Sequence, residues 1–272
     1  MDLNDNNITV GIPFYIGSNP KYFNLAIKSI LEQTLCPTKI HLIQDGEINK
    51  ALNDIVYHYK SNYPKLIDVI KLSKKGLPSA LNQSIKQTYT KYYARMDSDD
   101  ISLKDRLEVQ VNFLEENPNI EILGSWAYEF ENDYDKENLF LNKTPNSIKE
   151  IEEYFHYRNP LIHPSTVFKM SVFKRIGFYN EKMYTDQDLE LWGRALRSKV
   201  NICNIQKPLI LLRIENRLIR RSQLSAIKRQ IIIRYSYNTS SFKLNVLKLA
   251  AIILRVLPLK LRKWSYRNLR SF

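Results

Sequence analysis

The first 117 residues alternate between segments with the apolar spacing of strands and segments with the spacing of helices. The strand pattern predicts strands at residues 8–15, 39–44, 66–72 and 92–96. The helical pattern predicts helices at residues 20–33, 53–63, 78–88 and 103–117. Strands that alternate with helices favour a mostly parallel central sheet flanked by helices, which is an α/β fold.

The pattern after Gly124 is less regular. Residues 129–137 are acidic and polar, which indicates a loop or a sheet edge, and two prolines make residues 159–164 irregular. Further elements are expected as a short helix at residues 148–154, a helix at 188–198, a strand at 200–212, and helices at 222–237 and 242–257.

The strand expected at residues 92–96 ends in three carboxylates, Asp97, Asp99 and Asp100. Clustered carboxylates repel one another at the end of a packed strand unless a cation neutralises them. Their hard oxygen atoms suit Mg²⁺ or Mn²⁺, which can also hold a diphosphate. The alternative is an acidic loop before the next helix, with Ser102 as its cap and Asp105 as the partner in a capping box.

A second acidic group, Asp45, follows the strand at residues 39–44. In open α/β sheets ligands bind beyond the carboxyl ends of the strands, so Asp45 and the three carboxylates are expected to face one crevice. The chain has seven glycines and contains neither Gly-x-Gly-x-x-Gly nor a Gly-Lys-Ser phosphate loop. A dinucleotide-binding or nucleotide-hydrolysing fold is therefore disfavoured.

Positive charge is concentrated at the C-terminal end. From Lys207 onward there are 16 Lys and Arg residues and one acid, Glu215, whereas the preceding 206 residues hold 25 basic and 27 acidic residues. This asymmetry divides the chain into a body, residues 1–215, and a basic helical tail, residues 216–272, and it predicts an anionic partner for the tail.

Within the tail, residues 242–257 are mostly apolar but are interrupted by Lys243, Lys248 and Arg255, so the segment is too short to cross a bilayer. An apolar helix with basic and aromatic surroundings fits a membrane interface with an anionic surface. The alternatives are a helix that packs on the body and a nucleic-acid-binding stripe, and the long aliphatic run disfavours the second. The polar N-terminus and the widely spaced Cys36 and Cys203 indicate a cytoplasmic protein without disulfides.

Several segments in the order and spacing of one family resemble the family 2 glycosyltransferases of the GT-A fold, of the bacterial surface-polysaccharide type. They span residues 8–215 and are Val10-Gly11-Ile12-Pro13-Phe14-Tyr15, Ser29-Ile30-Leu31-Glu32-Gln33-Thr34, Ile43-Gln44-Asp45-Gly46, Gly76-Leu77-Pro78-Ser79-Ala80-Leu81-Asn82, Ala94-Arg95-Met96-Asp97-Ser98-Asp99-Asp100, His163-Pro164 and Asp188-Leu189-Glu190-Leu191-Trp192-Gly193-Arg194. The chain departs from the family at Ile16, where Asn is common, and at Gln187, where a Glu usually precedes the Asp. The Gln-x-x-Arg-Trp signature of processive synthases is absent.

The resemblance implies inverting, non-processive transfer of a hexosyl or N-acetylhexosaminyl group from a nucleoside diphosphate, with UDP expected. It implies a Mn²⁺ or Mg²⁺ ion held by Asp99, with Asp97 contacting the ribose or the water shell of the ion, and Asp100 as the alternative ligand. Asp45 corresponds to the position that reads the uracil edge. Pro13 and Tyr15 are expected to line the base pocket.

The resemblance also assigns Asp188 as the base that deprotonates the acceptor hydroxyl, whereas the alternative makes it the N-cap of the next helix. His163 is a candidate for contacting phosphate or acceptor, or else a packed loop residue. Trp192 is a candidate for stacking on a sugar, or else a core residue. Arg213 lies where related enzymes place an Arg near the donor phosphates.

Together these inferences predict an enzyme on the inner face of the bacterial cell membrane that extends a lipid-linked saccharide for O-antigen or capsule. Two alternatives come from other classes. One is a non-catalytic membrane-bound scaffold that keeps the glycosyltransferase fold. The other is a nucleic-acid-binding protein that acts through its basic tail.

Overall fold

The structure, a computed structural model, describes residues 7–131, 139–214 and 224–256. Its strands are β1 (Ile8–Phe14), β2 (Lys39–Asp45), β3 (Ile67–Leu72), β4 (Tyr92–Arg95), β5 (Ile101–Ser102), β6 (Ile122–Phe130), β7 (Phe140–Asn142), β8 (Val167–Lys169) and β9 (Ile202–Arg213). Its helices are α1 (Pro20–Leu31), α2 (Lys50–Asn62), α3 (Leu77–Gln87), α4 (Arg106–Glu116), α5 (Ile148–Phe155), the short 3-10 helix η2 (His163–Ser165), α6 (Ser171–Ile176), α7 (Gln187–Arg197), α9 (Leu224–Tyr235) and α10 (Phe242–Val256).

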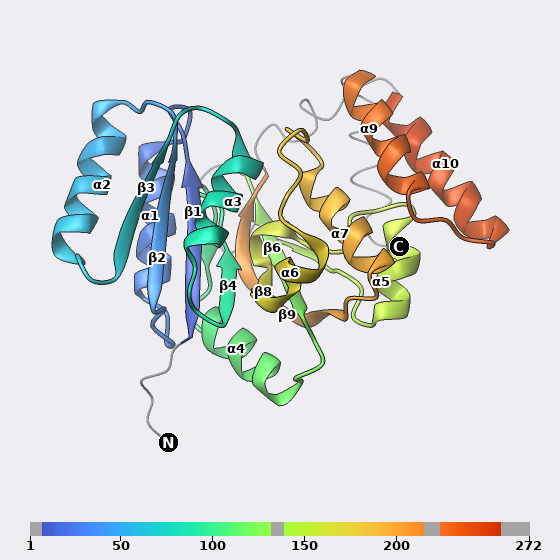
Figure 1. The fold of residues 1–272 in the computed structure, drawn as a ribbon, viewed down its shortest axis with the longest axis horizontal. Coiled ribbons are helices and arrows are strands. Elements are labelled where there is room, and N and C mark those ends of the chain that lie inside the picture. Colours follow the sequence, from blue (N-terminus) through green and yellow to red (C-terminus); the bar gives the residue numbers. More distant parts are fainter. Residues whose placement is uncertain (1–6, 132–138, 215–223, 257–272) are drawn as a thin grey trace.

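The described strands form one sheet in the order β3-β2-β1-β4-β8-β6-β9-β5, with β7 paired to β6 (Figure 1). The pairs from β3 to β4 are parallel, as predicted, and antiparallel pairs join β4 to β8 and β8 to β6. The chain passes from β1 to β2 on one side and returns to β4 on the other. The carboxyl ends of β1 and β4 therefore flank a topological switch, where ligands bind in such sheets.

Helices cover both faces of the sheet and give the molecule two main hydrophobic cores. On one face, Ile27 of α1, Val56 of α2 and Leu107 of α4 pack against β1, together with Ala94 of β4. The adjacent residue Tyr93 points to the other face, where it packs with α3, α5, α6 and α7. This alternation follows from the period of two in a strand and explains why β4 is apolar at successive positions.

The predicted capping box before α4 is wrong. Ser102 lies in β5, and its backbone N–H donates to Ser29 Oγ at 3.0 Å. Asp105 holds the N-cap position of α4 and makes no side-chain capping bond.

The region predicted to be least regular contains strands that the sequence analysis missed. β6 takes in Glu129 and Phe130, which were expected in a loop or an edge, and it pairs with β7, β8 and β9. The end of that predicted loop, residues 132–137, lies outside the described residues. β6 is irregular at Trp126, where its register against β9 shifts.

α9 packs against the body and lies beside α10 (Figure 1). Ile233 of α9 belongs to the same buried cluster as Trp192 of α7 and Phe155 of α5. Within the described residues, no helix is long and apolar enough to cross a membrane.

Candidate active site

The three carboxylates predicted as a metal site lie together just beyond β4. Asp97, Asp99 and Asp100 each offer an oxygen atom, and these atoms lie within 4.8 Å of one another. Asp97 is partly buried, Asp99 is exposed and Asp100 is fully buried. An all-oxygen donor set of this size fits a hard divalent cation such as Mg²⁺ or Mn²⁺.

Three buried arginines, Arg95, Arg106 and Arg213, lie near these carboxylates. Arg95, whose side chain is 3% exposed, forms an ion pair with Asp97 through Nη2. Arg106 is fully buried, and its Nη2 donates to the Arg95 carbonyl at 2.9 Å. Burial and the nearby charge of Arg95 lower the pKa of Arg106 to about 9, and the negative charge of Asp100 opposes that shift. The opposite charges compensate one another in a low dielectric.

Arg213, at the end of β9, fixes the acidic loop. Its backbone N–H donates to Asp100 Oδ1 at 2.8 Å, and its Nε donates to the Asp99 carbonyl at 3.1 Å. Its guanidinium lies 3.5 Å from the ring centre of Tyr22 and 4.5 Å from that of Phe130. Arg213 therefore lies at the predicted site, where it contacts the acidic loop and two aromatic rings.

The end of β1 adjoins the same loop. Pro13 is buried, and Tyr15 is exposed at the start of a turn in which the Tyr15 N–H donates to Ser18 Oγ at 3.1 Å. Ser18 Oγ lies 3.3 Å from the hydroxyl of Ser98, between the metal candidates. The two residues predicted to line a base pocket therefore lie on a segment tied to the acidic loop.

Asp45 organises the loop between β3 and α3. Its Oδ1 accepts the Lys75 N–H at 2.7 Å, and its Oδ2 accepts the Gly76 N–H at 3.0 Å. Gly76 adopts φ +90°, a conformation that suits glycine. This structural role was missed at the sequence level, because the partner of Asp45 is 30 residues away in the chain.

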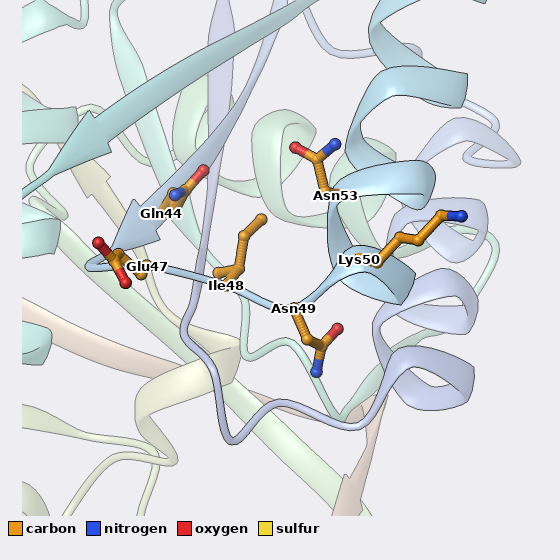
Figure 2. Close-up of a pocket in the computed structure, with 6 residues that line it drawn as sticks. All are labelled: Gln44, Glu47, Ile48, Asn49, Lys50 and Asn53. Atoms are coloured by element: carbon orange, nitrogen blue, oxygen red, sulfur yellow. The ribbon is translucent and has the colours of Figure 1, made fainter.

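An open pocket lies beside Asp45, between the end of β2 and the start of α2 (Figure 2). Gln44 and Glu47 come from the strand exit, and Asn49, Lys50 and Asn53 come from the helix start, with Ile48 between them. None of the predicted site residues lines this pocket.

Asp188 is the second residue of α7 and is half-buried. Asn159 Nδ2 donates to its Oδ2 at 2.5 Å. The N-cap position belongs to Asp186, so the alternative that made Asp188 the N-cap is wrong.

His163 and Trp192 are packed together in the core. His163 Nε2 is 2.8 Å from the Tyr179 hydroxyl, and burial, together with the charge of Arg95, lowers its pKa well below the usual value. Trp192 is fully buried; its ring stacks on Phe168 and meets the edge of His163. Trp192 therefore presents no exposed ring face to a sugar, so the predicted stacking role is wrong. The alternative, a core residue, is confirmed.

Two features near the site were missed in the sequence. Arg95 was treated as part of a buried strand, although a charge inside an apolar run is itself a signal of a specific partner. Asn82 clamps Tyr179 by donating to its carbonyl and accepting from its N–H, both at 2.9 Å. No local pattern points to this contact, because it joins residues 97 positions apart.

Comparison with known proteins agrees with this geometry. The family model of Glycosyl transferase family 2 matches residues 9–177. The chain is 31% identical over 269 residues to the Escherichia coli UDP-Gal:alpha-D-GlcNAc-diphosphoundecaprenol beta-1,3-galactosyltransferase, covering 96% of this chain and 95% of the relative. It is 29% identical to the amylovoran biosynthesis glycosyltransferase AmsE of Erwinia amylovora, over 75% of both chains.

Solved GT-A glycosyltransferases share the fold. S. aureus TarS 1–349 in complex with UDP-GlcNAc superposes with a TM-score of 0.67 at 17% identity, covering 91% of this chain and 72% of the TarS 1–349 chain. The mannosyltransferase PcManGT from Pyrobaculum calidifontis, in complex with GDP-Man and Mn²⁺, gives a TM-score of 0.62 at 14% identity, covering 98% of this chain and 81% of the other.

Proposed function

The chain belongs to glycosyl transferase family 2, and on that premise we propose that it moves one hexosyl or N-acetylhexosaminyl group from a UDP-sugar to a lipid-linked saccharide, with inversion. The observation that carries this proposal is the group of three carboxylates at the switch point of the sheet. The carboxylates and the surrounding arginines are poised to bind a metal together with a diphosphate.

The charges of the site support joint binding of metal and nucleotide. Arg95, Arg106 and Arg213 lie near the three carboxylates and already supply positive charge, so a divalent ion alone adds uncompensated positive charge. A diphosphate supplies the missing negative charge. Asp99 is the preferred ligand because it is exposed, whereas Asp100 is buried and accepts a backbone N–H. When bound, the metal would act as a Lewis acid that stabilises the leaving diphosphate.

Asp188 supplies the base in this proposal. The acceptor oxygen forms the new bond to the anomeric carbon, the bond from that carbon to the diphosphate oxygen breaks, and the hydroxyl proton passes to Asp188. The hydrogen bond from Asn159 fixes one carboxylate oxygen of Asp188 and so helps to orient this group. Pro13, Tyr15 and the Asp45-bound loop would surround the base of the donor.

A lipid-linked acceptor and a membrane-surface location belong to the same proposal. The E. coli relative is named for a diphosphoundecaprenol acceptor. On α10, four apolar side chains at helical spacing expose 49–83% of their surface: Phe242, Val246, Leu249 and Ile253. Lys248, which interrupts this run in the sequence, is buried instead, with its Nζ 4.7 Å from the ring centre of Tyr235. The exposed stripe is thus free of that charge and suits the inner face of the cell membrane.

The donor site is tested by calorimetry of UDP with Mn²⁺ and with chelator. Wild type is expected to bind UDP tightly only with metal, and Asp99→Asn is expected to weaken that binding at least tenfold. Asp54→Asn, an exposed acid on α2, is the control. UDP binding that is unchanged by the chelator and by Asp99→Asn would overturn the assignment of the acidic loop as the metal and diphosphate site.

Turnover separates an enzyme from a scaffold. Asp188→Asn is expected to lower kcat by roughly 10²- to 10⁴-fold while UDP binding persists. A wild-type protein that binds UDP but transfers sugar from no tested UDP-sugar to a diphosphate-lipid saccharide would favour the non-catalytic scaffold.

Binding of the protein to a membrane surface is tested by sedimentation with vesicles that contain anionic lipid. Leu249→Glu is expected to weaken vesicle binding about tenfold, whereas Tyr57→Glu, on an exposed position of α2, is expected to leave it unchanged. Tight salt-dependent binding to RNA in place of vesicles would support the nucleic-acid alternative.

A further inference from the structure

We propose that α9 is the element that positions the proposed base: Gln230 and Arg229 hold the turn at Thr185 and Asp186 and thereby fix Asp188. This inference rests on the proposed function for the role of Asp188. It assigns positioning residues to a part of the chain outside the matched family region, residues 9–177.

The turn before α7 has an uncommon conformation, in which the Thr185 hydroxyl donates to Asp186 Oδ2 at 3.5 Å. Asp186 occupies the N-cap position with φ +60°, in the left-handed region that few side chains favour. Its carboxylate makes no capping bond to the first turn of α7, although its carbonyl accepts the Glu190 N–H at 3.0 Å. Contacts from elsewhere in the molecule can therefore add to the few that the turn supplies at the start of the helix.

Those contacts come from α9. Gln230 Nε2 donates to Asp186 Oδ1 at 2.7 Å, and Arg229 Nη2 donates to Thr185 Oγ1 at 2.6 Å. Arg229 Nε also lies 3.9 Å from Asp186 Oδ2. Two successive residues of one helix thus hold two successive residues of the turn.

Gln230 is itself held in place. It is buried, and its Oε1 accepts from Arg234 Nε at 2.9 Å. Arg234 is also buried, and its Nη1 donates to the Phe155 carbonyl at the end of α5. A buried amide that accepts from an arginine on one side and donates to a carboxylate on the other is a rigid link, because breaking it leaves buried polar groups unpaired.

The consequence falls on Asp188, two residues beyond the turn. Its carboxylate accepts a hydrogen bond from Asn159, and its backbone lies in the first turn of α7. The position of the carboxylate therefore depends on where that turn begins. Without the bonds from α9, Asp186 is expected to leave the left-handed conformation, which shifts the first turn of α7. A shift of about 1 Å in a reacting group can cost roughly 100-fold in rate.

The test uses the full-length protein and the variant Gln230→Met, which keeps the side-chain length and removes the amide. We expect kcat to fall about 10- to 100-fold, with the KM for the donor and the UDP binding constant within about twofold of wild type. Lys228→Ala, an exposed change on the same helix, is the matched control and is expected to keep full kcat.

Variants at Asp186 separate the contact from the backbone conformation. Asp186→Asn keeps an oxygen that accepts from Gln230 and tolerates positive φ, so it is expected to retain most of kcat. Asp186→Gly tolerates the conformation but loses the contact, so it is expected to lose kcat as Gln230→Met does.

Three results would overturn the inference. In one, Gln230→Met keeps kcat within twofold of wild type. In the second, UDP-binding stoichiometry falls in parallel with kcat, which shows a general structural role. In the third, Asp186→Gly keeps full kcat. Failure of the proposed function looks different, because then wild type lacks turnover or Asp188→Asn keeps it.

Discussion

Among single residues, Arg95 contacts one of the three carboxylates directly through its side chain. It is buried at the end of β4, and its Nη2 is paired with Asp97. Removal of one partner of a buried pair leaves the other charge uncompensated, whereas removal of both avoids that penalty. The two residues are therefore energetically coupled, and the coupling can be measured.

We expect Arg95→Met to lower the free energy of unfolding by about 2–3 kcal/mol, because a charge-assisted hydrogen bond and its compensation are lost. The double variant Arg95→Met/Asp97→Asn is expected to cost less than the sum of the two single changes. Urea denaturation of the four proteins in a double-mutant cycle measures this difference. Strict additivity would show that the pair contributes nothing to stability.

Residue identity and order in the chain were enough to predict the three carboxylates and their position at a strand end. They were not enough to find the partners of those carboxylates. Arg213 reaches Asp100 across 113 positions, and Lys248 turns away from the apolar stripe that it interrupts in the sequence. Such contacts depend on how distant elements pack, which local spacing does not encode.

At the scale of elements, the side chain of Tyr93 on β4 lies over Gly11 of the neighbouring strand β1 and leaves no room for a side chain there. A Cβ at this position would lie 1.9 Å from Tyr93 Oη and 3.0 Å from Ser84 Oγ. We expect Gly11→Ala to lower the free energy of unfolding by about 1–3 kcal/mol through overpacking.

The double variant Gly11→Ala/Tyr93→Phe tests this cause. Because Phe lacks the hydroxyl that meets the new methyl group, the double variant is expected to recover part of the loss seen in Gly11→Ala. Chemical denaturation of both variants and of Tyr93→Phe alone gives the comparison. A double variant that loses the full sum of both changes would place the strain in the backbone instead.

The long periodic elements were predictable and the short paired ones were not. Helices α1, α3 and α7 and strands β1 to β4 fall within a few residues of their predicted ranges, because each carries its own apolar period. β8 has three residues and β5 has two, and both exist only through pairing with distant strands. β6 was not predicted as a strand, because Gly124 and the irregular register at Trp126 interrupt the alternating pattern of its residues.

For the whole molecule, the sequence predicted a body, residues 1–215, and a basic helical tail, residues 216–272, and Ile233 of α9 in that tail belongs to the same buried cluster as Trp192 of α7. Lys248 Nζ also donates to the Tyr237 carbonyl at 3.3 Å, which joins α10 to the end of α9. The proposed membrane face and the proposed base are therefore connected through one packed helix.

The buried histidines give the whole molecule a distinct dependence on pH. His41, His156 and His163 are buried, and burial is the main cause that lowers each pKa in the folded state, to about 4 for His156. The charges of Lys248 and Arg234 add to the shift at His156. In the unfolded chain these residues titrate near 6.5, so below that pH the unfolded state binds more protons. The stability that these three neutral histidines contribute is therefore fully present above pH 6.5 and is lost as the pH falls toward 4.

His156→Phe isolates one part of this effect. Phe keeps a ring to pack against Tyr237, whose ring centre lies 5.7 Å from that of His156, and it removes the titrating group. Between pH 6.5 and about 4, wild type is expected to lose about 1.4 kcal/mol more stability per pH unit than His156→Phe. Urea denaturation at pH 7.5, 6.5, 5.5 and 4.5 measures both slopes, and carboxylates such as Asp68 contribute equally to each. His58→Phe, at an exposed position of α2, is expected to follow wild type; if His156→Phe does so too, protonation of His156 is not what destabilises the folded protein in acid.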